Sequence, residues 1–468
     1  MKISGIKIRG ITCNSKAVKK GFIFVAIRGN RQDGACFIKE AVANGASIVV
    51  IGKGAAKIKI PAKIKLLAVD NPRNFLAEAA AEFYGFPAQH MRVAGITGTN
   101  GKTTTSYLIE AMAKQSGYGC GVIGTINYRF KGKEVPARNT TPGPVELQGM
   151  LAKMRTQKIP YCAMEVSSHA LDQERVLGIN FSQAIFTNLT QDHLDYHKNL
   201  KNYFLAKSRL FRGLTPDGVA IINHDDKYGR RIKSLISCRL ISYGIKNKST
   251  VMAKEIDSGI GGTEFTLIAP GLNSRVKTRL IGRYNIYNIL AAVSWGISEG
   301  LNSGDIKSAI EEFKNVPGRL EKVGCKKGRN IFVDYAHTPD ALFNVISALR
   351  PLVKGRVIVI FGCGGERDKL KRPKMGRIAS RLADYVIITS DNPRSEDPSR
   401  IIRDIRRGIS KSNYYAIPDR FKAIKAGLKL IKNDDCLIIA GKGHEDYQVL
   451  KDRILHFSDR EAVAKCLQ

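Results

Sequence analysis

A glycine-rich loop between an apolar run and a helical pattern constrains this chain more than any other feature. The loop, Gly98-Thr99-Asn100-Gly101-Lys102-Thr103-Thr104, follows the apolar run 93–96 and precedes a helix predicted over 106–112. This order of strand, loop and helix is typical of phosphate-binding loops, whose backbone N–H groups surround phosphate oxygens. Lys102 adds a positive charge, and the Thr103 hydroxyl can reach Mg²⁺. The sequence therefore predicts a nucleoside triphosphate site.

One position departs from the usual form of such loops. A glycine commonly stands five residues before the Gly-Lys pair, and this chain has Ile96 there. The alternative interpretation is an ordinary glycine turn before a basic helix. The flanking strand and helix patterns favour the phosphate-binding loop.

Length and composition predict a multi-domain protein of the cytoplasm. The 468 residues allow about three domains, and a hydrophobic content of 43% supports buried cores. No apolar run is long enough to span a membrane, and the first residues lack the apolar segment of a signal peptide. The nine cysteines form no CxxC pair, as expected of reduced thiols in a cytoplasm.

The net charge of +35 raises nucleic-acid binding as an alternative function. The excess of Lys and Arg is spread over the whole chain, without a basic tail or an aromatic-interleaved patch. We therefore favour a generally basic composition, or an anionic substrate, over nucleic-acid binding.

Apolar runs that resemble buried strands alternate with helical patterns along the chain. Strands are expected over 22–27, 47–51, 161–164, 183–186, 219–222, 331–334, 357–361, 385–389 and 436–440, and helices over 37–43 and 340–349. This alternation predicts an α/β fold of doubly wound sheets with ligands at the carboxyl ends of the strands. With a linker near 83–87 and a boundary near 316–318, it predicts three domains: a smaller N-terminal α/β domain (1–88), a central phosphate-loop domain (89–317) and a C-terminal Rossmann-like domain (318–468).

Two strand ends of the central segment carry candidate metal ligands. Glu165 follows one strand, and His193 lies beyond the next. Because Mg²⁺ prefers oxygen ligands, Glu165 and Thr103 suit one ion, and residue type alone makes His193 a phosphate contact. Zinc bound by His193 and His197 is the alternative, although no third ligand stands out.

Two other residues have ordinary interpretations when residue pattern alone is considered. Lys207 lies on an amphipathic helical pattern and is expected to be a solvated lysine. Asn285 lies near the start of an apolar helix, where its amide could pair with an adenine edge, but a helix cap is favoured.

Charged side chains follow four strand ends of the C-terminal segment. They are Arg367, Asp391, Asn392, Arg394 and Glu445. Arginines bind carboxylates in a bidentate manner, and acids hold ammonium groups. The mixture suits an amino acid with more than one charged end, whereas four unrelated solvated loops are the alternative.

Taken together, these strings resemble the Mur ligase family over essentially the whole chain. The motifs are GTNGKTTT at 98–105, EVSSHAL at 165–171, DHLDYH at 192–197, DYAHTPDAL at 334–342, DNPR at 391–394 and GKGHEDYQ at 441–448. Their shared order and spacing make the resemblance specific.

The resemblance implies a cytoplasmic, monomeric ligase that uses ATP and Mg²⁺ and binds no nucleic acid. Its substrates would be UDP-N-acetylmuramoyl-L-Ala-D-Glu and meso-2,6-diaminopimelate, joined through an acyl phosphate during peptidoglycan synthesis. The alternatives are the same reaction with L-lysine, the next ligase of the pathway and, in a different class, a nucleic-acid-dependent ATPase.

The resemblance also implies residue roles. Lys102, Lys207 and His193 would be catalytic. Thr103, Glu165, His193 and Lys207, once carbamoylated, would hold Mg²⁺. The ATP contacts would be Gly98, Thr99, Asn100, Gly101, Lys102, Thr103, Thr104, Asn285, Arg319 and Asp334. The UDP-linked substrate would contact Cys13, Ser15, Asn30, Arg31, Gln32, Asn139, Thr140, Thr141, Ser167, Gln173 and Arg175. Diaminopimelate would contact Arg367, Asp391, Asn392, Pro393, Arg394, Gly441 and Glu445.

Within that set, Arg394 would hold the second carboxylate of diaminopimelate, which lysine lacks. One departure affects the N-terminal segment, where the family's Asp-Ser-Arg is replaced by Asn14-Ser15-Lys16. This departure removes a charge pair from the expected uridine site and leaves the ATP and amino-acid sites untouched.

Overall fold

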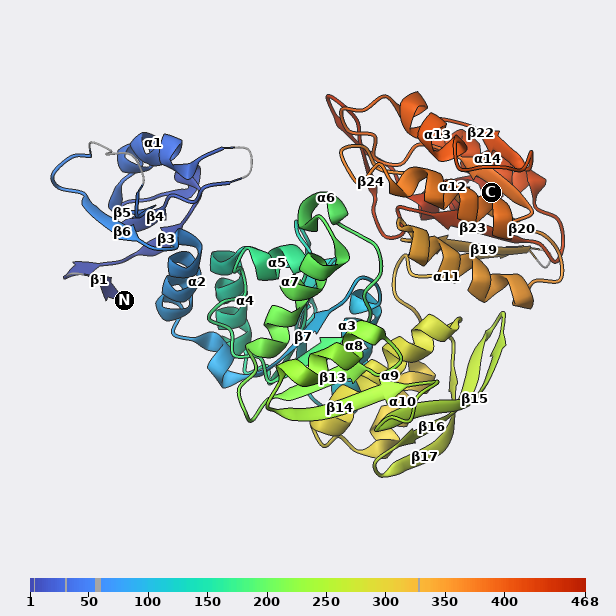
Figure 1. Ribbon diagram of the computed structural model, residues 1–468, viewed down its shortest axis with the longest axis horizontal. Coiled ribbons are helices and arrows are strands. Elements are labelled where there is room, and N and C mark those ends of the chain that lie inside the picture. The colour runs from blue at the N-terminus through green and yellow to red at the C-terminus, as the bar shows by residue number, and fades with distance from the viewer. Residues whose placement is uncertain (4, 30–31, 55–59, 327–328) are drawn as a thin grey trace.

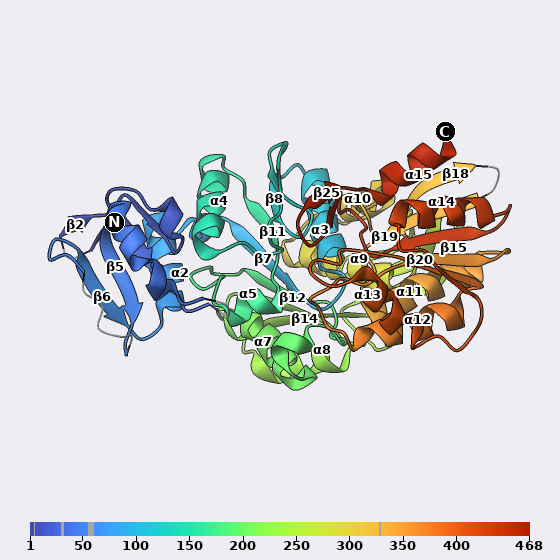
Figure 2. The same cartoon turned by 90° about the horizontal axis from the view of Figure 1, so that it is seen from above.

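The computed structural model describes residues 1–468 except 4, 30–31, 55–59 and 327–328. Three α/β units follow one another along the molecule, with the N-terminal unit at one end and the C-terminal unit at the other (Figures 1 and 2). The α/β class and the three-domain architecture agree with the sequence analysis. The boundaries after residues 88 and 317 stay predictions.

The N-terminal unit is a four-stranded parallel sheet with helices packed against it. Its sheet order is β3-β4-β5-β6. The bounds are β1 Lys2–Ile3, β2 Ile6–Lys7, β3 Gly10–Thr12, β4 Phe22–Val25, β5 Ala46–Gly52, β6 Lys65–Val69, α1 Ile38–Ala43 and α2 Pro72–Phe83, with 3₁₀ turns at Ser15–Ala17, Gly34–Phe37 and Pro87–His90. The strands and the helix expected from the sequence are present. Gly85 and Phe86, in the expected linker, have positive φ angles.

The central unit is an 11-stranded mixed sheet in the order β10-β9-β8-β11-β7-β12-β13-β14-β15-β16-β17. The strands are β7 Arg92–Thr97, β8 Cys120–Ile123, β9 Asn127–Phe130, β10 Lys133–Pro136, β11 Tyr161–Glu165, β12 Gln183–Phe186, β13 Val219–Asn223, β14 Arg239–Gly244, β15 Val251–Gly259, β16 Gly262–Ala269 and β17 Leu272–Thr278. Strands β8, β11, β7, β12, β13, β14 and β15 are parallel neighbours, whereas β9–β10 and β16–β17 add antiparallel edges. The sequence analysis did not predict these edges.

Helices cover both faces of the central sheet. Their bounds are α3 Lys102–Gln115, α4 Pro144–Thr156, α5 Ser168–Asp172, α6 Leu194–His197, α7 Leu200–Arg212, α8 Lys227–Ile232, α9 Arg283–Ser298 and α10 Ser303–Glu312, with a 3₁₀ turn at Lys233–Leu235. One core joins Leu108 of α3 to Leu290 and Trp295 of α9. A second core, around Leu151 of α4 and Phe211 of α7, lies on the other face.

The C-terminal unit is a six-stranded sheet in the order β18-β19-β23-β20-β21-β22. The bounds are β18 Glu321–Lys326, β19 Arg329–Asp334, β20 Val357–Phe361, β21 Tyr385–Ile388, β22 Tyr414–Ala416, β23 Cys436–Ala440, β24 Tyr447–Val449, β25 Ile454–His456, α11 Pro339–Leu349, α12 Lys371–Leu382, α13 Pro398–Arg406, α14 Arg420–Leu430 and α15 Asp459–Leu467, with a 3₁₀ turn at Arg350–Leu352. Strands β19 to β22 are parallel.

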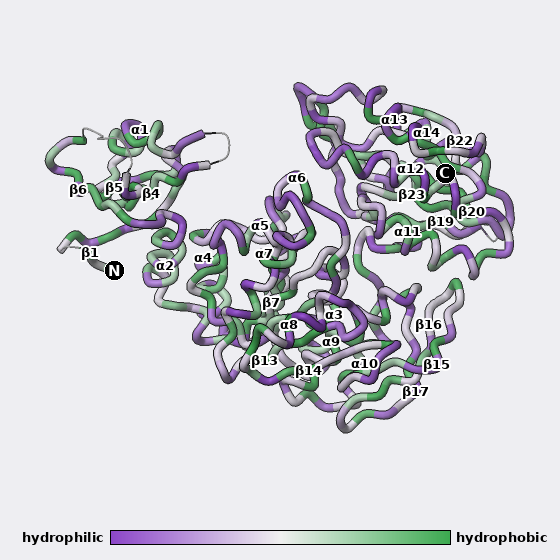
Figure 3. The backbone as a smooth tube through the Cα atoms, viewed as in Figure 1, coloured by the Kyte–Doolittle hydropathy of each residue, from purple (hydrophilic) through white to green (hydrophobic). Residues whose placement is uncertain are grey.

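Hydrophobic residues of this C-terminal sheet pack against helices on both faces. Helices α11, α12 and α13 contribute to one core, and α14 and α15 to the other. Hydrophobic residues lie along the strands, while loops are largely hydrophilic (Figure 3). Among the described residues, no helix is long and apolar enough to cross a membrane.

Candidate functional site

A cleft of about 1080 Å³ lies where the carboxyl ends of the central strands face those of the C-terminal sheet. Such strand ends are the usual ligand position in doubly wound folds. The cleft brings together most of the predicted ATP, metal and amino-acid residues. Predicted residues that line it are Thr99, Asn100, Gly101, Lys102, Thr103, Thr104, Asn139, Thr140, Glu165, Ser167, His193, Asn285, Arg319, Asp334, Arg367, Asp391, Asn392, Arg394, Gly441 and Glu445.

The glycine loop joins β7 to α3, and its backbone lies in close contact with the side chains of Thr187 and Lys102. Gly98 has φ +153°, and a Cβ there would lie 1.9 Å from Thr187 Oγ1. Gly101 is the N-cap of α3 with φ +89°. Lys102 Nζ donates to the carbonyls of Gly98 and Thr99, both at 2.9 Å. The side chain therefore folds back over the loop that it is predicted to serve.

Ile96, the departure in the glycine pattern, lies within β7 and is fully buried. Its side chain belongs to the core between β7 and α3. The glycines needed for close approach are instead Gly98 and Gly101. The departure therefore affects packing of the strand and leaves the loop intact.

Glu165, the last residue of β11, forms a buried oxygen cluster with two threonines. Its Oε2 accepts from Thr103 Oγ1 at 3.1 Å and from Thr125 Oγ1 at 2.9 Å. Its Oε1 accepts from the Thr125 backbone N–H at 2.9 Å. These carboxylate and hydroxyl oxygens fit the donor preference of Mg²⁺. No group of three or more His, Cys, Asp or Glu residues suitable for a metal is present in the part of the chain that the structure describes.

His193 lines the cleft beside Asp192. His193 is the N-cap of the short helix α6 and has a φ of +53°. Its Nε2 lies 3.4 Å from Asp192 Oδ2. Burial lowers the pKa of His193, although the Asp192 carboxylate opposes this shift. His197 is buried and its Nε2 lies 2.9 Å from Ser168 Oγ. The zinc interpretation thus lacks a third ligand among the described residues, and His197 already has a protein partner.

Lys207 is the clearest correction to the pattern-based analysis. It was expected to be solvated, but it is 2% exposed on α7 and its Nζ donates to the Gly98 carbonyl at 2.8 Å. The ammonium also lies 4.5 Å from the centre of the Tyr203 ring. Burial, and then the nearby Lys102 charge, lower the pKa of Lys207 well below its ordinary value. Lys207 therefore reaches the phosphate loop from beneath and does not line the cleft.

Asn285 is also not the predicted helix cap. The N-cap of α9 is Gly282, and no side chain caps this end. Asn285 is 3% exposed; its Nδ2 donates to the Ile281 carbonyl at 2.9 Å and its Oδ1 accepts from Asn288 Nδ2 at 3.1 Å. It lines the cleft, so the adenine alternative remains a prediction.

Two contacts connect the C-terminal unit to the phosphate loop. Arg319 Nη2 donates to Thr103 Oγ1 at 3.1 Å, with its guanidinium 4.5 Å from the centre of the Tyr335 ring. Asn100 Nδ2 donates to Asp340 Oδ2 at 2.8 Å. The two units therefore meet at the predicted triphosphate site.

Asp334, at the end of β19, has a raised pKa, which predicts that the free energy of unfolding depends on pH. Its Oδ2 accepts from the Leu320 N–H at 2.5 Å, and burial raises its pKa to about 6. An unfolded Asp ionises near 4, so the folded state retains a proton that the unfolded state releases between about pH 4 and 6. This group's stabilising contribution is thus present below pH 4 and is lost, by an amount on the order of 2–3 kcal/mol, as the pH rises to 6.

Thermal unfolding of the wild type and Asp334→Asn between pH 4 and 7 measures this contribution. We expect the wild type to lose stability relative to the variant as the pH rises through this interval. Parallel curves would show that Asp334 titrates normally in the folded protein.

The predicted dipeptide contacts form a connected group beside Glu165. Thr141 Oγ1 donates to the Glu165 carbonyl at 2.8 Å, and Arg175 Nη1 donates to the Thr141 carbonyl at 2.9 Å. Gln173 Oε1 accepts from both Nε and Nη2 of Arg175. Ser167 Oγ caps α5 by accepting from the Ala170 N–H at 3.2 Å. Of these four dipeptide contacts, only Ser167 lines the cleft, together with the predicted contacts Asn139 and Thr140.

The described members of the predicted uridine site, Cys13, Ser15 and Gln32, belong to the N-terminal unit, and none of them lines the cleft. Ser15 is buried and its Oγ donates to Glu40 Oε2 at 2.5 Å. Cys13 and Gln32 are exposed. Asn30 and Arg31 lie outside the described residues. The structure therefore does not bring Cys13, Ser15 and Gln32 to the ATP and amino-acid groups.

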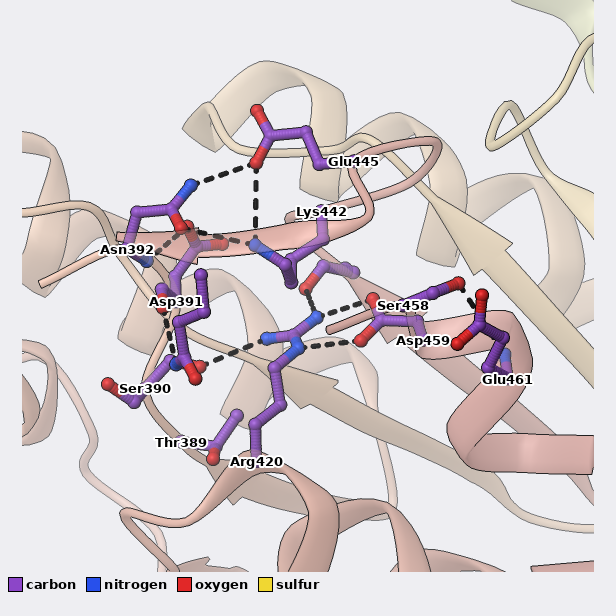
Figure 4. Close-up of polar contacts among 12 residues, drawn as sticks. Thr389, Ser390, Asp391, Asn392, Arg420, Lys442, Glu445, Ser458, Asp459 and Glu461 are labelled. Atoms are coloured by element: carbon purple, nitrogen blue, oxygen red, sulfur yellow. Dashed lines mark hydrogen bonds and ion pairs between the residues drawn. The ribbon is translucent and has the colours of Figure 1, made fainter. Parts of the chain in front are cut away.

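The DNPR and GKGHE motifs form one hydrogen-bonded group at the rim of the C-terminal sheet (Figure 4). Asn392 Nδ2 donates to Glu445 Oε2 at 2.8 Å, while Asn392 Oδ1 accepts from Lys442 Nζ at 3.2 Å. Arg394 has φ +54°, and its Nη1 donates to the Gly365 carbonyl at 2.8 Å. Pro393 adjoins this group without lining the cleft. The rim thus presents both cationic and anionic groups, as expected for an amino-acid site.

Family models match almost the whole chain in three consecutive segments. The Mur ligase family catalytic domain matches 7–84, the Mur ligase middle domain 96–296 and the Mur ligase glutamate ligase domain 318–443. A Clostridium botulinum protein named UDP-N-acetylmuramoyl-L-alanyl-D-glutamate–2,6-diaminopimelate ligase is 40% identical over 99% of this chain and 95% of its own length. This chain belongs to the Mur ligase family. Membership confirms the ATP-dependent ligase class that the motifs implied.

Other relatives of this Mur ligase agree with the assignment. A Bacillus velezensis protein of the same name is 41% identical over 98% of this chain and 94% of its own. A solved structure of a ligase with the same name superposes with a TM-score of 0.69 and 31% identity, covering 98% of this chain and 94% of its own. A MurF ligase from Thermotoga maritima in complex with ADP has a TM-score of 0.67 at 20% identity, covering 98% and 96%, and supports the fold.

Several contacts of the Mur ligase site were missed by sequence reasoning. Asn188 holds the Asn100 backbone through bonds of 3.0 and 3.1 Å. Asp192, Lys371 and Asp340 line the cleft. Asp192 and Asp340 lie within the motifs DHLDYH and DYAHTPDAL, so their position was a usable signal. Lys371 lies in a basic run that resembles an ordinary solvated helix start.

Proposed function

We propose that this Mur ligase adds meso-2,6-diaminopimelate to the D-glutamyl γ-carboxylate of UDP-N-acetylmuramoyl-L-Ala-D-Glu in the cytoplasm. The observation that carries the proposal is the placement of two charged groups on one cleft. The phosphate loop lies on one side, and Arg367, Arg394, Asp391 and Glu445 lie on the other. A carboxylate activated at the first group would face an amine held at the second.

The proposed reaction has two steps. The γ-carboxylate oxygen attacks the γ-phosphorus of ATP, which releases ADP and leaves an acyl phosphate. The amine of diaminopimelate then attacks the acyl carbon, and the tetrahedral intermediate expels inorganic phosphate to leave an amide. The amine loses one proton to solvent.

The chain's own residues would position these groups and balance their charge. Lys102 donates to the carbonyls of Gly98 and Thr99. With ATP bound, it would donate to phosphate oxygens instead. Arg319 reaches the same Thr103 hydroxyl from the C-terminal unit and would close the site over the nucleotide. Thr103 and Glu165 would hold Mg²⁺, which supplies charge neutralisation of the triphosphate when bound.

At the amino-acid side, burial raises the pKa of Asp391, but Lys442 and Arg420 outweigh burial and lower it below the ordinary value. Asp391 is therefore anionic and suited to an ammonium group. Nη1 of Arg394 is held by Gly365, and its Nε and Nη2 have no hydrogen-bond partner among the described residues. These donors would bind the distal carboxylate of diaminopimelate.

Phosphate release from ATP tests the proposal directly. We expect release to require both the UDP-linked dipeptide and diaminopimelate, and to be unaffected by DNA or RNA. Release stimulated by nucleic acid without the dipeptide would instead support the nucleic-acid-dependent ATPase.

Arg394→Ala is expected to weaken diaminopimelate use selectively. Loss of a charged hydrogen bond worth about 1.5–3 kcal/mol predicts a rise in KM for diaminopimelate of roughly 10- to 100-fold. The KM values for ATP and the dipeptide should not change. Steady-state kinetics measure this split, with the exposed Arg400→Ala on α13 as control. An equal rise in KM with L-lysine as the amine would show that Arg394 does not recognise the second carboxylate.

A further inference from the structure

A fully buried ion pair lies beneath the rim that carries Asp391 and Glu445 (Figure 4). Arg420 begins α14 and Asp459 begins α15, and both side chains are 0% exposed. Arg420 Nε and Nη2 donate to the two carboxylate oxygens of Asp459, each at 2.7 Å. Because burying a single charge is costly, each partner makes the burial of the other possible.

The same guanidinium also contacts both loops of the amino-acid rim. Nη1 donates to the Ser390 carbonyl at 3.3 Å and Nη2 to the Ala440 carbonyl at 3.0 Å. Ser390 immediately precedes Asp391, and Ala440 immediately precedes Gly441. The strands that lead into these loops, β21 and β23, are separated by β20 in the sheet. Arg420 therefore links two loops whose strands do not pair with each other.

The two loops meet closely above this link. A Cβ on Gly441 would lie 2.6 Å from Asp391 Oδ2. Asn392 and Lys442, one from each loop, are bonded at 3.2 Å, and Asn392 also bonds Glu445 at 2.8 Å. A small shift of either loop would therefore alter the spacing of the Asp391 and Glu445 carboxylates.

We propose that Arg420 and Asp459 are positioning residues of the amino-acid site, which set the spacing of the two loops and thereby the affinity for the incoming amino acid. The planar fork of Arg420 bonds two carbonyls and one carboxylate at once. Lysine cannot reproduce this pattern, because its ammonium is a compact point charge. The inference rests on the proposed function, in which this rim binds the amino acid.

Arg420→Lys and Asp459→Asn test the inference by a split of kinetic constants. Loss of loop spacing predicts a rise in the KM for diaminopimelate of roughly tenfold or more, because small misplacements of binding groups weaken catalysis strongly. The KM values for ATP and the UDP-linked dipeptide should remain those of the wild type. The melting temperature of each variant is measured in parallel.

Arg356→Lys is a matched control. Arg356 also pairs with an aspartate: its Nε and Nη2 both donate to Oδ2 of Asp435, at 3.1 and 2.7 Å, and its Nη2 also donates to the Leu430 carbonyl. This pair lies at the opposite ends of β20 and β23, away from the rim. We expect the control to lower the melting temperature while leaving the KM for diaminopimelate unchanged.

Three results would overturn the positioning role. One is an unchanged KM for the amino acid in folded Arg420→Lys or Asp459→Asn. Another is an equal rise in KM in the Arg356→Lys control. The third is failure of both test variants to fold, which would assign the pair to stability. If the wild type prefers another amino acid, the proposed substrate fails, and the KM split is then measured with the amino acid that is used.

Discussion

Replacing Lys102 by alanine is expected to reduce ATP-dependent turnover by about 100- to 1000-fold, the loss seen when a preorganised charge-stabilising donor is removed. The Nζ lies within 2.9 Å of the Gly98 and Thr99 carbonyls, at the centre of the loop. Burial lowers its pKa, while Glu165 and Asp192 oppose that shift. A phosphate would therefore gain a poorly solvated cation, whose interaction is stronger than that of a surface lysine.

Steady-state phosphate release measures the loss, with Lys114→Ala as the matched control. Lys114 is exposed in the last turn of the same helix, so its removal changes charge and helix composition without touching the loop. If Lys102→Ala turned over as fast as the control, the glycine loop would have no role in catalysis.

Replacing Lys207 by methionine is expected to reduce turnover by about 100-fold or more, a loss comparable to removal of a catalytic electrostatic group. Family resemblance implies that Lys207 is carbamoylated, and the structure makes the amine suitable for this reaction. Burial and Lys102 lower its pKa, which favours the neutral amine. The neutral amine nitrogen would attack the carbon of CO₂ and lose one proton, which leaves a carbamate anion beneath Gly98 in place of the neutral amine.

The stability of Lys207→Met separates this role from a structural one. Methionine has a similar length, and the Gly98 carbonyl keeps Lys102 Nζ as a donor, so the substitution leaves no buried acceptor unpaired. We therefore expect an inactive variant whose melting temperature is not lowered. Wild-type activity should fall in CO₂-depleted buffer and recover with bicarbonate, whereas the exposed Lys201→Met control should behave like the wild type. Wild-type turnover by Lys207→Met would contradict the role.

Local pattern was sufficient for the elements that position the site. The apolar runs that form β7, β11 and β23 are buried on both faces, which is why the sequence shows them as continuous hydrophobic strands. The motif residues follow such strands, so their convergence on one edge was predictable from topology. The antiparallel strands β16 and β17 were missed because they pair at the edge of the sheet, where alternating polar residues resemble loops.

Other features depend on contacts that the sequence cannot display. The amphipathic pattern around Lys207 is the same whether a lysine faces solvent or the floor of a phosphate loop. Its burial follows from the packing of α7 beneath Gly98. Similarly, Arg420 lies in a basic helix, and only the folded sheet brings it between Ser390 and Ala440. Asn285 resembles a cap by position, but Gly282 is the N-cap and the helix begins at Arg283.

Product formation with three amines tests the central claim most directly. The wild type would be given ATP, the UDP-linked dipeptide and either meso-diaminopimelate, L-lysine or L-ornithine, and the UDP-linked product would be weighed by mass spectrometry. We predict a tripeptide product and stoichiometric phosphate release with meso-diaminopimelate, and little product with the two amines that lack a second carboxylate. Equal rates with all three amines, or faster reaction with L-lysine, would contradict the account.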